Sequence, residues 1–455
     1  MRSGTLLHVR RLFAVLLVNL VLLVCLLEIG ALAVCYVRDG KLFYTTERVQ
    51  SELVPSRFAD VPNNVLHPVL GFIRPPGLPI TVVASRERLD GLVGAGVTPG
   101  WLSRRANNFG FFSDRDYPFG RDERKEYLIG IFGGSVGHWF ALQGAKRLED
   151  RLQSSGVLKD RHPRILNFAQ GAFKQPQQLQ TLCYFLARGQ PFDFVVNIDG
   201  FNEVALSYLN LTSRVDPSLP SGQQLLPIIA LLGGASASSE YLEALTAVNR
   251  KRRTLVSIGQ WDQHNRSAAV HLLLEQFRAM VVRSYWQSVR SLDALAARAK
   301  RTPLIHVNEV ATDGFERGDE EVFEQFAGLW AHSSSLMKQL LAGLGIPYLH
   351  VLQPNQYYTK RTFGSAEQAL ALDARSSYAL PAAKGYPYLL ARLPALRKEG
   401  VLVFSAVDIF DSVSQPVYAD SCCHYNQLGN EILADFIADR LIGALVVQDA
   451  IHSAN

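Results

Sequence analysis

The sequence predicts an α/β protein with a parallel sheet, preceded by one membrane-spanning helix. Two observations lead to this fold class. The first is an almost uninterrupted apolar segment near the N-terminus, from Leu12 to Tyr36. The second is a recurring order of apolar run, Gly- or Asn-containing loop and helical stretch that begins at Glu126. Because this order is typical of βαβ units, it implies parallel strands with helices on the faces of the sheet.

The apolar segment is long enough to cross a membrane. At about 1.5 Å per residue it exceeds a hydrocarbon core of about 30 Å. Arg10 and Arg11 precede it, and a positive flank of this kind stays cytoplasmic, so we expect the rest of the chain outside the cytoplasm. A cleaved signal peptide is the alternative, but the stretch is longer than a signal core and no small-residue cleavage pattern follows it. Glu28 inside the segment is expected at an interface or beside a partner.

Composition limits the classes of partner. The chain has 48% hydrophobic and 19% charged residues, as expected for a protein with a buried core. The net charge of +5 comes from short clusters such as Arg104-Arg105 without a long basic run, so no nucleic-acid partner is expected. The five cysteines form no Cys-x-x-Cys pairs, so we expect neither a metal nor another cofactor. Cys183, Cys422 and Cys423 are expected either as thiols or with two of them bridged.

Five short apolar runs are expected to form the sheet. They are residues Tyr127–Phe132, Arg164–Phe168, Phe192–Ile198, Pro347–Leu352 and Val401–Phe404. Helices are expected to follow, including one from Ser135 to Gln153 and a last one from Leu428 to Val446.

This pattern predicts an order of segments along the chain. Residues 1–11 are expected in the cytoplasm and residues 12–36 in the membrane. An irregular lead-in covers residues 37–125, and the α/β domain covers residues 126–446 with a long insertion around residues 204–345. Residues 447–455 form a tail.

The residues suited to chemistry lie where ligands bind in open α/β sheets, beyond the carboxyl ends of the strands. Three loops there carry Ser135, Gly171 and Asn202, and a fourth polar cluster contains Asp420 and His424. A serine hydroxyl needs an adjacent base, which His424 can supply, and Asp420 can orient the imidazole. The backbone N–H groups of Ser135 and Gly171 and the side-chain amide of Asn202 are candidate donors to an oxyanion.

In order and kind, these blocks resemble the SGNH (GDSL-like) hydrolase superfamily. Gly133-Gly134-Ser135 resembles block I, and Gly171 resembles the block II glycine. Gly200-Phe201-Asn202-Glu203 resembles the block III Gly-x-Asn-Asp, with glutamate in the last place. Asp420 and His424 resemble the block V Asp-x-x-His, although their spacing is four residues where the family usually has three.

The resemblance implies a flavodoxin-like three-layer α/β/α fold, as in SGNH hydrolases, and a Ser-His-Asp enzyme. Membrane-anchored members of the superfamily carry elements similar to His67–Phe72 and Asn107–Phe111. The function expected from the resemblance is an extracytoplasmic serine esterase or deacylase that acts on an O-acyl ester, including an acylated glycan. The alternatives are an O-acyltransferase to an extracellular polysaccharide, and a non-catalytic binding or assembly protein on a hydrolase scaffold.

Each motif also has a structural interpretation. Residues 133–137 fit the G-x-S-x-G elbow of α/β-hydrolases, but Asp420 and His424 are closer in sequence than that fold requires. The same glycines fit a tight strand-to-helix turn, and they lack the Lys of a phosphate-binding loop. His424 could be a surface or capping residue, Gly171 a loop start and Asn202 an Asx-turn residue. His138 and His350 are expected to be structural.

Overall fold

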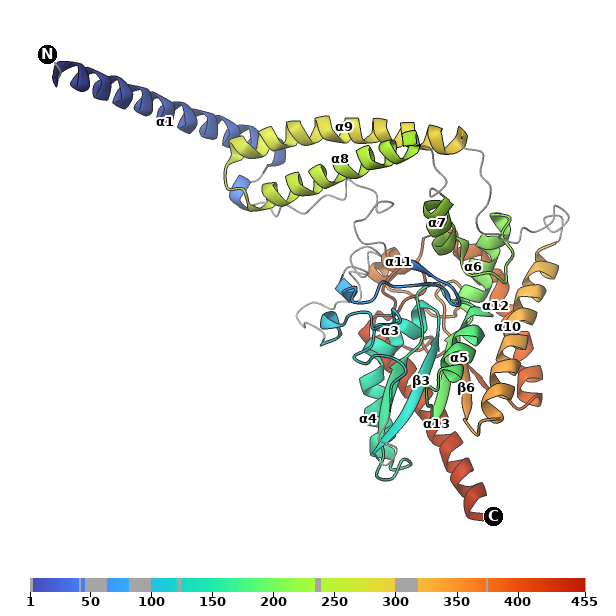
Figure 1. The fold of residues 1–455 in the computed structure, drawn as a ribbon. Coiled ribbons are helices and arrows are strands. Elements are labelled where there is room, and N and C mark those ends of the chain that lie inside the picture. Colours follow the sequence, from blue (N-terminus) through green and yellow to red (C-terminus); the bar gives the residue numbers. More distant parts are fainter. Residues whose placement is uncertain are drawn as a thin grey trace. The chain divides into compact units, whose positions relative to one another are not determined.

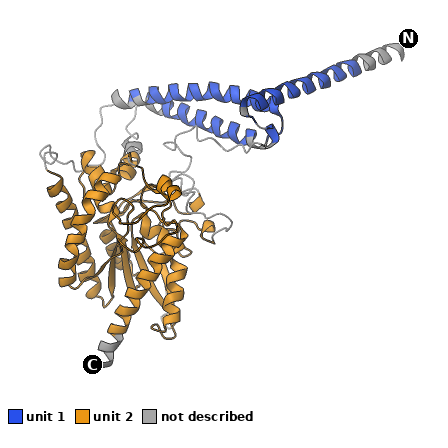
Figure 2. Cartoon of the chain, turned by 180° about the vertical axis from the view of Figure 1, so that it is seen from behind, with its two compact units in different colours: residues 1–60, 232–304 blue, residues 61–231, 305–455 orange. Residues whose placement is uncertain are grey.

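The computed structural model describes residues 3–40, 42–45, 64–81, 100–120, 125–233, 239–298, 318–373 and 375–454. The chain forms two compact units, each made of two separate stretches of sequence (Figure 2). Unit 1 contains residues 1–60 and 232–304, and unit 2 contains residues 61–231 and 305–455. The segment expected as one insertion, residues 204–345, is therefore divided between the two units.

Unit 2 is built on a sheet of five parallel strands. Their order is β4 (His162–Asn167), β3 (Glu126–Gly133), β5 (Phe194–Asp199), β6 (Tyr348–Leu352) and β7 (Leu402–Ser405). Each strand begins and ends within two residues of its predicted run, so the α/β class with a parallel sheet is confirmed. The chain order reverses beside β3, because β4 lies on one side of it and β5 on the other. Such a switch point is where open sheets bind ligands.

Helices flank the sheet in two groups (Figure 1). The first group consists of α3 (Ser135–Gln143), α4 (Ala145–Ser155) and α13 (Gln427–Ala454), which contact one another. The second consists of α5 (Gln177–Ala187), α6 (Phe201–Thr212), α10 (Asp319–Ala342) and α12 (Ala379–Lys398). The shorter helices of unit 2 are α7 (Gly222–Gly233) and α11 (Ser365–Ala371).

The helix predicted from Ser135 to Gln153 is instead two helices, because it breaks at Gly144. A Cβ atom on Gly144 would lie 2.9 Å from the carbonyl oxygen of Asn430 in α13 and 2.8 Å from the Phe140 ring. The close approach of α13 therefore explains the glycine at this position, and α3 is left as a short helix that begins at Ser135.

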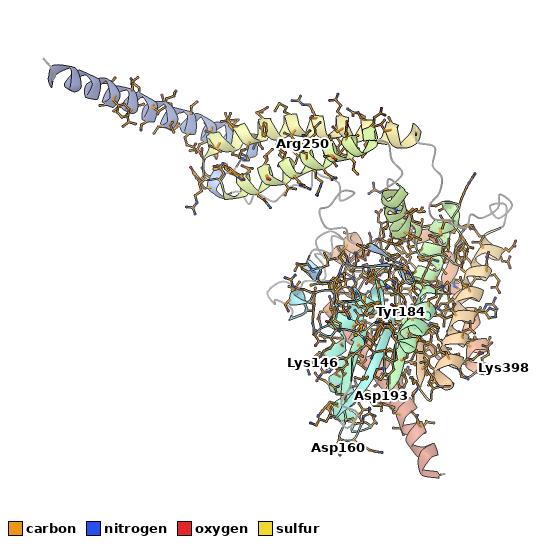
Figure 3. The ribbon with its side chains drawn as sticks, viewed as in Figure 1. Lys146, Asp160, Tyr184, Asp193, Arg250 and Lys398 are labelled. Atoms are coloured by element: carbon orange, nitrogen blue, oxygen red, sulfur yellow. The ribbon has the colours of Figure 1, made fainter. Side chains whose placement is uncertain are left out.

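The lead-in contributes directly to unit 2. Strands β1 (Val65–His67) and β2 (Gly71–Ile73) form an antiparallel hairpin, and a short 3-10 helix, η4, covers Gly100–Ser103. In the turn of the hairpin, His67 Nδ1 accepts hydrogen bonds from the N–H groups of Val69 and Leu70. The His67 ring packs edge-on against Tyr184 of α5, which Figure 3 labels. The hairpin is thus fixed against the helices of the α/β unit.

The second lead-in element packs against the end of this hairpin. Asn107 Oδ1 accepts hydrogen bonds from the N–H groups of Phe109 and Phe111 and so shapes the turn. Gly110 has a positive φ of 80°, and a Cβ on it would lie 2.3 Å from the carbonyl oxygen of Arg74. Only glycine allows this approach, and the contact holds the backbone of Arg74 in place.

Unit 1 contains the apolar helix α1 (Ser3–Asp39), η1 (Phe43–Thr45) and the long helices α8 (Ser239–His264) and α9 (Ala268–Arg298). Residues Phe13–Arg38 of α1 have a mean hydropathy of 2.7 over their most apolar window. Among the described helices, α1 is the one long and apolar enough to cross a membrane, and a signal sequence would share these properties. The partner expected for Glu28 is present, because its carboxylate accepts a hydrogen bond from Ser267 Oγ at 2.6 Å.

Candidate active site

Two glycines at the end of β3 allow three loops to meet. Gly133 has a φ of +143°, and a Cβ on it would lie 2.1 Å from the carbonyl oxygen of Ile198 in β5. A Cβ on Gly134 would lie 2.2 Å from Asn202 Nδ2 and 3.0 Å from the carbonyl oxygen of Phe173. The turn is therefore tight, as the structural interpretation required, and it also places Ser135 next to the predicted oxyanion-hole loops.

Asn202 lies in the first turn of α6 and is buried. Its Nδ2 donates a hydrogen bond to the carbonyl oxygen of Phe173 at 2.8 Å, in the loop that also contains Gly171. A carboxamide carries two N–H donors, so this bond fixes the orientation of the group and leaves a second donor. The loop is in turn tied to β3, because the Gln170 N–H donates to the carbonyl oxygen of Gly133 at 3.2 Å.

Glu203, at the position where the block III motif that this segment resembles has aspartate, has a positioning role in the same region. Its carboxylate accepts hydrogen bonds from the N–H groups of Gln175 and Gly200 and from Gln178 Nε2. Burial, with a further contribution from the charge of Asp199, raises the pKa of Glu203 to about 8. The longer glutamate side chain thus links the loop of Gly171 to the start of α6.

Asp420 and His424 are in contact despite their spacing. Asp420 Oδ2 lies 2.5 Å from His424 Nδ1. Asp420 Oδ1 accepts hydrogen bonds from the N–H groups of Cys422, Cys423 and His424. The two residues do not lie on a helical turn, the geometry in which side chains four residues apart usually meet. The contact arises in a tight bend, in which Tyr418 and Tyr425 pair as an antiparallel bridge.

The electrostatics of this pair suit the proposed role of the acid. Burial raises the pKa of the Asp420 carboxyl. The charge of His424 and the hydrogen bonds that the carboxyl accepts together lower the pKa by more, so the net result is a lowered pKa. The carboxyl group is therefore ionised at neutral pH. An ionised acid on Nδ1 holds the imidazole in one orientation and stabilises its cation.

Ser135 lies beside the same bend. Its Oγ is 3.8 Å from Cys423 Sγ, and Cys423 Sγ in turn lies within 4.8 Å of a ring nitrogen of His424. Ser135 is partly exposed, whereas the His424 side chain is 8% exposed. The fold thus collects Ser135, Asn202, Asp420 and His424 at one end of the sheet, with Gly171 in the adjoining loop. Cys423 was not predicted as a neighbour of Ser135, and its only signal was its position before His424.

A buried ion pair holds the bend in place. Glu367 Oε2 lies 2.7 Å from Arg361 Nη2, and the two side chains are 2% and 1% exposed. Glu367 Oε1 also accepts hydrogen bonds from the N–H groups of Val417 and Tyr418, where the bend begins. On the far side of the bend, the Tyr425 hydroxyl donates to the carbonyl oxygen of Pro354. These contacts fix both ends of the segment that carries Asp420 and His424.

Arg74 is a site residue that the sequence did not reveal. It is buried, and its Nη2 lies 3.3 Å from the position that a Cβ on Gly171 would occupy. A buried guanidinium beside the candidate oxyanion hole adds positive potential there. The sequence offered only an indirect signal, because Arg74 closely follows the His67–Phe72 element without belonging to a motif of its own.

His138 is a structural residue and not a second base. It is buried and packs edge-on against Phe112 and Trp139. The pKa of His138 is lowered to about 3. Burial is the main cause, and the charges of Arg74 and His424 make smaller contributions in the same direction. The ring is therefore neutral throughout the physiological range.

A second serine, histidine and aspartate form a triad-like set in the core. Ser334 Oγ lies 2.7 Å from His350 Nδ1, and His350 Nε2 lies 2.7 Å from Asp199 Oδ1. Asp199 also accepts hydrogen bonds from Trp330 Nε1 and Asn197 Nδ2. His350 and Ser334 are fully buried, so a substrate cannot reach them. This network therefore stabilises the fold between α10 and the sheet.

We expect His350→Ala to lower the free energy of unfolding by about 3–5 kcal/mol, because it leaves the buried Asp199 carboxylate without its histidine partner. Ser334→Ala should cost only about 1 kcal/mol, the net value of one hydrogen bond. Chemical unfolding of the full chain, followed by tryptophan fluorescence, measures both. Equal costs for the two variants would show that the network contributes little through its charge.

The chain matches no protein-family model, and no curated protein matches it. The functional assignment therefore depends on the geometry of the site.

Proposed function

We propose that the protein is a membrane-anchored, extracytoplasmic serine esterase or deacylase of the SGNH type, acting on O-acyl esters such as those of glycans. The observation that carries the proposal is the ionised Asp420 carboxylate in contact with His424, in a bend whose Cys423 lies 3.8 Å from Ser135 Oγ. The strand order of the sheet also supports the proposal. When the five strands are numbered by their position along the chain, they lie across the sheet in the order 2-1-3-4-5, which is the order of flavodoxin-like sheets.

In this proposal Ser135 Oγ attacks the ester carbonyl carbon while His424 accepts the hydroxyl proton. Asp420 stabilises the resulting imidazolium. The negative charge on the carbonyl oxygen is stabilised by the N–H groups of Ser135 and Gly171 and by the Asn202 amide. His424 then returns its proton to the leaving alkoxide, and an acyl group remains on Ser135. Water, activated by His424, releases the acid and restores the serine.

The same acyl-enzyme can transfer its acyl group to a glycan hydroxyl instead of water, so hydrolysis and transfer share every residue up to that step. The non-catalytic alternative was motivated by the four-residue spacing of Asp420 and His424. That spacing does not prevent contact, because Asp420 Oδ2 lies 2.5 Å from His424 Nδ1. The reason for the non-catalytic alternative is therefore weakened.

Labelling with a fluorophosphonate probe tests the proposal. The detergent-solubilised full chain should become labelled at Ser135 and should hydrolyse an activated acetyl ester. A folded protein that neither labels nor hydrolyses such an ester would overturn the proposal. Adding a glycan acceptor separates the two reactions, because a transferase forms acetylated glycan faster than it releases acetate.

The proposed location outside the cytoplasm has its own test. Cys183 is an exposed thiol on α5. A membrane-impermeant maleimide added to intact cells should label the wild-type chain and label Cys183→Ser much less. Labelling of Cys183 only after the membrane is permeabilised would contradict the proposed orientation.

We expect Asn202→Ala to lower kcat by about 10²–10³-fold with little change in KM, as for the loss of one oxyanion donor. The variant also loses its bond to the Phe173 carbonyl, which should cost only about 1 kcal/mol of stability. Ser207→Ala in the same helix is the matched control and should retain activity. Steady-state hydrolysis of the acetyl ester measures the effect, and an unchanged kcat would remove Asn202 from the oxyanion hole.

A further inference from the structure

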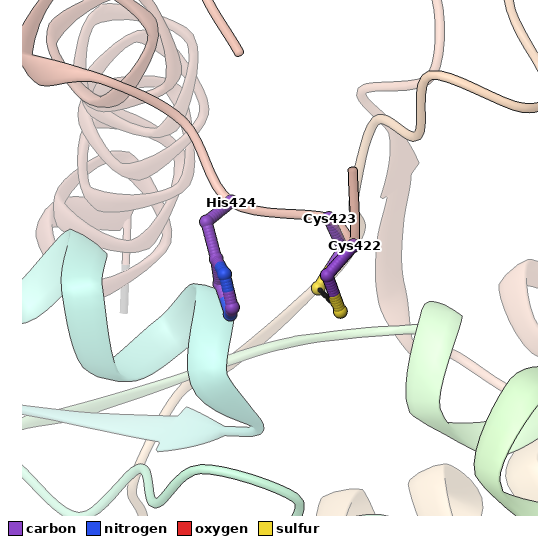
Figure 4. Close-up of side chains that lie close together, drawn as sticks. All are labelled: Cys422, Cys423 and His424. Carbon is purple, nitrogen blue, oxygen red and sulfur yellow. Dashed lines mark hydrogen bonds between the residues drawn. The ribbon is translucent and has the colours of Figure 1, made fainter. Parts of the chain in front are cut away.

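Three consecutive side chains in the bend before α13 point toward the same space. Figure 4 shows Cys422, Cys423 and His424 projecting from one side of the chain. One donor atom from each lies within 4.8 Å of the other two, and the two sulfur atoms are 3.5 Å apart. Cys423 and His424 are buried, and Cys422 is partly exposed. Ester chemistry requires only the histidine of this group, so the two thiols need another explanation.

The spacing of the donor atoms suits a tetrahedral metal ion. Zinc–sulfur bonds of about 2.3 Å in a tetrahedral site place two sulfur atoms about 3.8 Å apart, close to the separation seen here. Two thiolates with one imidazole are a soft donor set that favours zinc or cuprous ions over magnesium or calcium. Three protein ligands leave a fourth position open, as in catalytic zinc sites.

The surroundings of His424 also match a metal ligand. Asp420 Oδ2 lies 2.5 Å from His424 Nδ1, so the ring would offer Nε2 to the metal. A carboxylate on the second ring nitrogen is the usual partner of a metal-bound histidine. Asp420 Oδ1 meanwhile accepts the backbone N–H groups of all three ligand residues, which holds the bend in one conformation.

We propose that Cys422, Cys423 and His424 bind a thiophilic metal ion such as Zn²⁺, and that the bound ion inhibits the enzyme. Binding converts the two thiols to thiolates and releases two protons to solvent. The inhibition rests on the proposed function, because His424 cannot accept the Ser135 proton while its nitrogen binds the metal. The binding itself does not depend on that function. The absence of Cys-x-x-Cys pairs led us to expect no metal, but the bend assembles its ligands without such pairs.

Co²⁺ titration of the reduced full chain tests the binding. A thiolate-to-Co²⁺ charge-transfer band should saturate at one equivalent, and Zn²⁺ should displace it. Cys422→Ser and Cys423→Ser should each weaken binding by at least about tenfold. Cys183→Ser, which removes an exposed thiol in α5, outside the bend, is the matched control and should bind as the wild type does. A missing band, or one that persists in both bend variants, overturns the metal site.

A second titration tests the inhibition. Zn²⁺ should inhibit ester hydrolysis by the wild type, and Cys422→Ser should retain activity while losing most of its sensitivity to Zn²⁺. Labelling and hydrolysis without any charge-transfer band would overturn the metal site and leave the proposed function standing. A band in a protein that never labels with the fluorophosphonate would support the metal site and overturn the proposed function.

A different set of contacts, within unit 1, carries a second inference. The Glu28 carboxylate in α1 accepts hydrogen bonds from Ser267 Oγ and from the N–H groups of Ala268 and Ala269, at the start of α9. It therefore caps the positive end of that helix. Further along, Arg38 Nη1 lies 2.5 Å from Glu275 Oε2. The outer part of α1 and the first turns of α9 thus lie side by side.

The first turns of α9 also expose an apolar stripe. Val270, Leu273, Phe277 and Met280 recur at intervals of three and four residues, which places them on one face of the helix, and all four are exposed. Trp261, near the end of α8, is 76% exposed. Trp and long apolar side chains of this kind are typical of segments that lie at the boundary of lipid headgroups and acyl chains.

We propose that this stripe and Trp261 bind the outer leaflet of the membrane that α1 crosses. In vesicles of phosphatidylcholine with bromine-labelled acyl chains, the tryptophan emission of the full chain should be quenched. Trp261→Phe should remove a clear part of that quenching, whereas Trp286→Phe should remove less. Equal quenching in wild type and Trp261→Phe would overturn the proposal. A wild-type dimer that Leu273→Glu converts to monomers would also overturn it, because a second copy of the chain would then cover the stripe.

Discussion

Ser135→Ala is expected to abolish fluorophosphonate labelling and to lower kcat/KM for ester hydrolysis by at least about 10⁴-fold, because it removes the proposed nucleophile, on which the acyl-enzyme would form. The variant should fold normally, since Ser135 is partly exposed at the start of α3 and loses only a small hydroxyl. Steady-state hydrolysis of the acetyl ester and gel detection of the probe measure the two effects.

The matched control is Ser334→Ala. Ser334 Oγ lies 2.7 Å from His350, so it belongs to the other triad-like set in the molecule. The control should label and turn over like the wild type, with only its stability reduced. If instead Ser334→Ala lost activity and Ser135→Ala kept it, the candidate active site would be in the wrong place.

His424→Ala in the Ser135→Ala background adds a further constraint. Residues that act as one unit are strongly non-additive, so the double variant should be about as inactive as Ser135→Ala alone. Multiplicative losses would mean that Ser135 and His424 act in separate steps.

The five parallel strands could be predicted from the sequence because each contains a short apolar run, and all five appear within two residues of the predicted ends. Ser135 and Asn202 could be singled out because each follows a strand directly, and parallel strands bring such loops to one edge of the sheet. Local patterns were sufficient for these residues. The contact of α1 with α9 was not predictable, since nothing local links Glu28 to Ser267, residues that lie in distant parts of the chain.

Arg74 and Cys423 show where sequence reasoning ended. Arg74 lies close to Gly171, and its backbone packs against Gly110, a contact between two lead-in elements that no residue pattern in the sequence indicates. Cys423 was expected only as a thiol or as one half of a disulfide, yet its sulfur is 3.8 Å from Ser135 Oγ. The bend itself depends on the buried Arg361–Glu367 pair, which lies elsewhere in the sequence.

Asp420 lies four residues before His424, where the resembled motif has a spacing of three, and its replacement gives the second large effect. Asp420→Asn is expected to lower kcat by about 10⁴-fold, as when a triad acid is replaced by its amide. Asn Oδ1 can still accept the three backbone N–H groups, so the bend should keep its shape. The amide nitrogen, however, would face His424 Nδ1 as a donor, which favours the ring tautomer with its proton on Nε2. In that tautomer Nε2 cannot accept the proton of the serine hydroxyl. Steady-state hydrolysis measures the loss, and Asp408→Asn, at an exposed position before the bend, is the matched control.

Stability against pH provides a readout that a purely catalytic effect would not change. The folded protein has a lowered pKa at Asp420, so the ionised Asp420 carboxylate contributes stability above the pKa of the unfolded carboxyl, near 3.9 for a typical Asp. That contribution is lost as pH falls through the lower folded value. Asp420→Asn cannot lose a proton, so its free energy of unfolding should depend less on pH in that acidic window than that of wild type. Parallel curves for the two proteins, together with an unchanged kcat, would remove Asp420 from the active site and leave His424 to act without an acid.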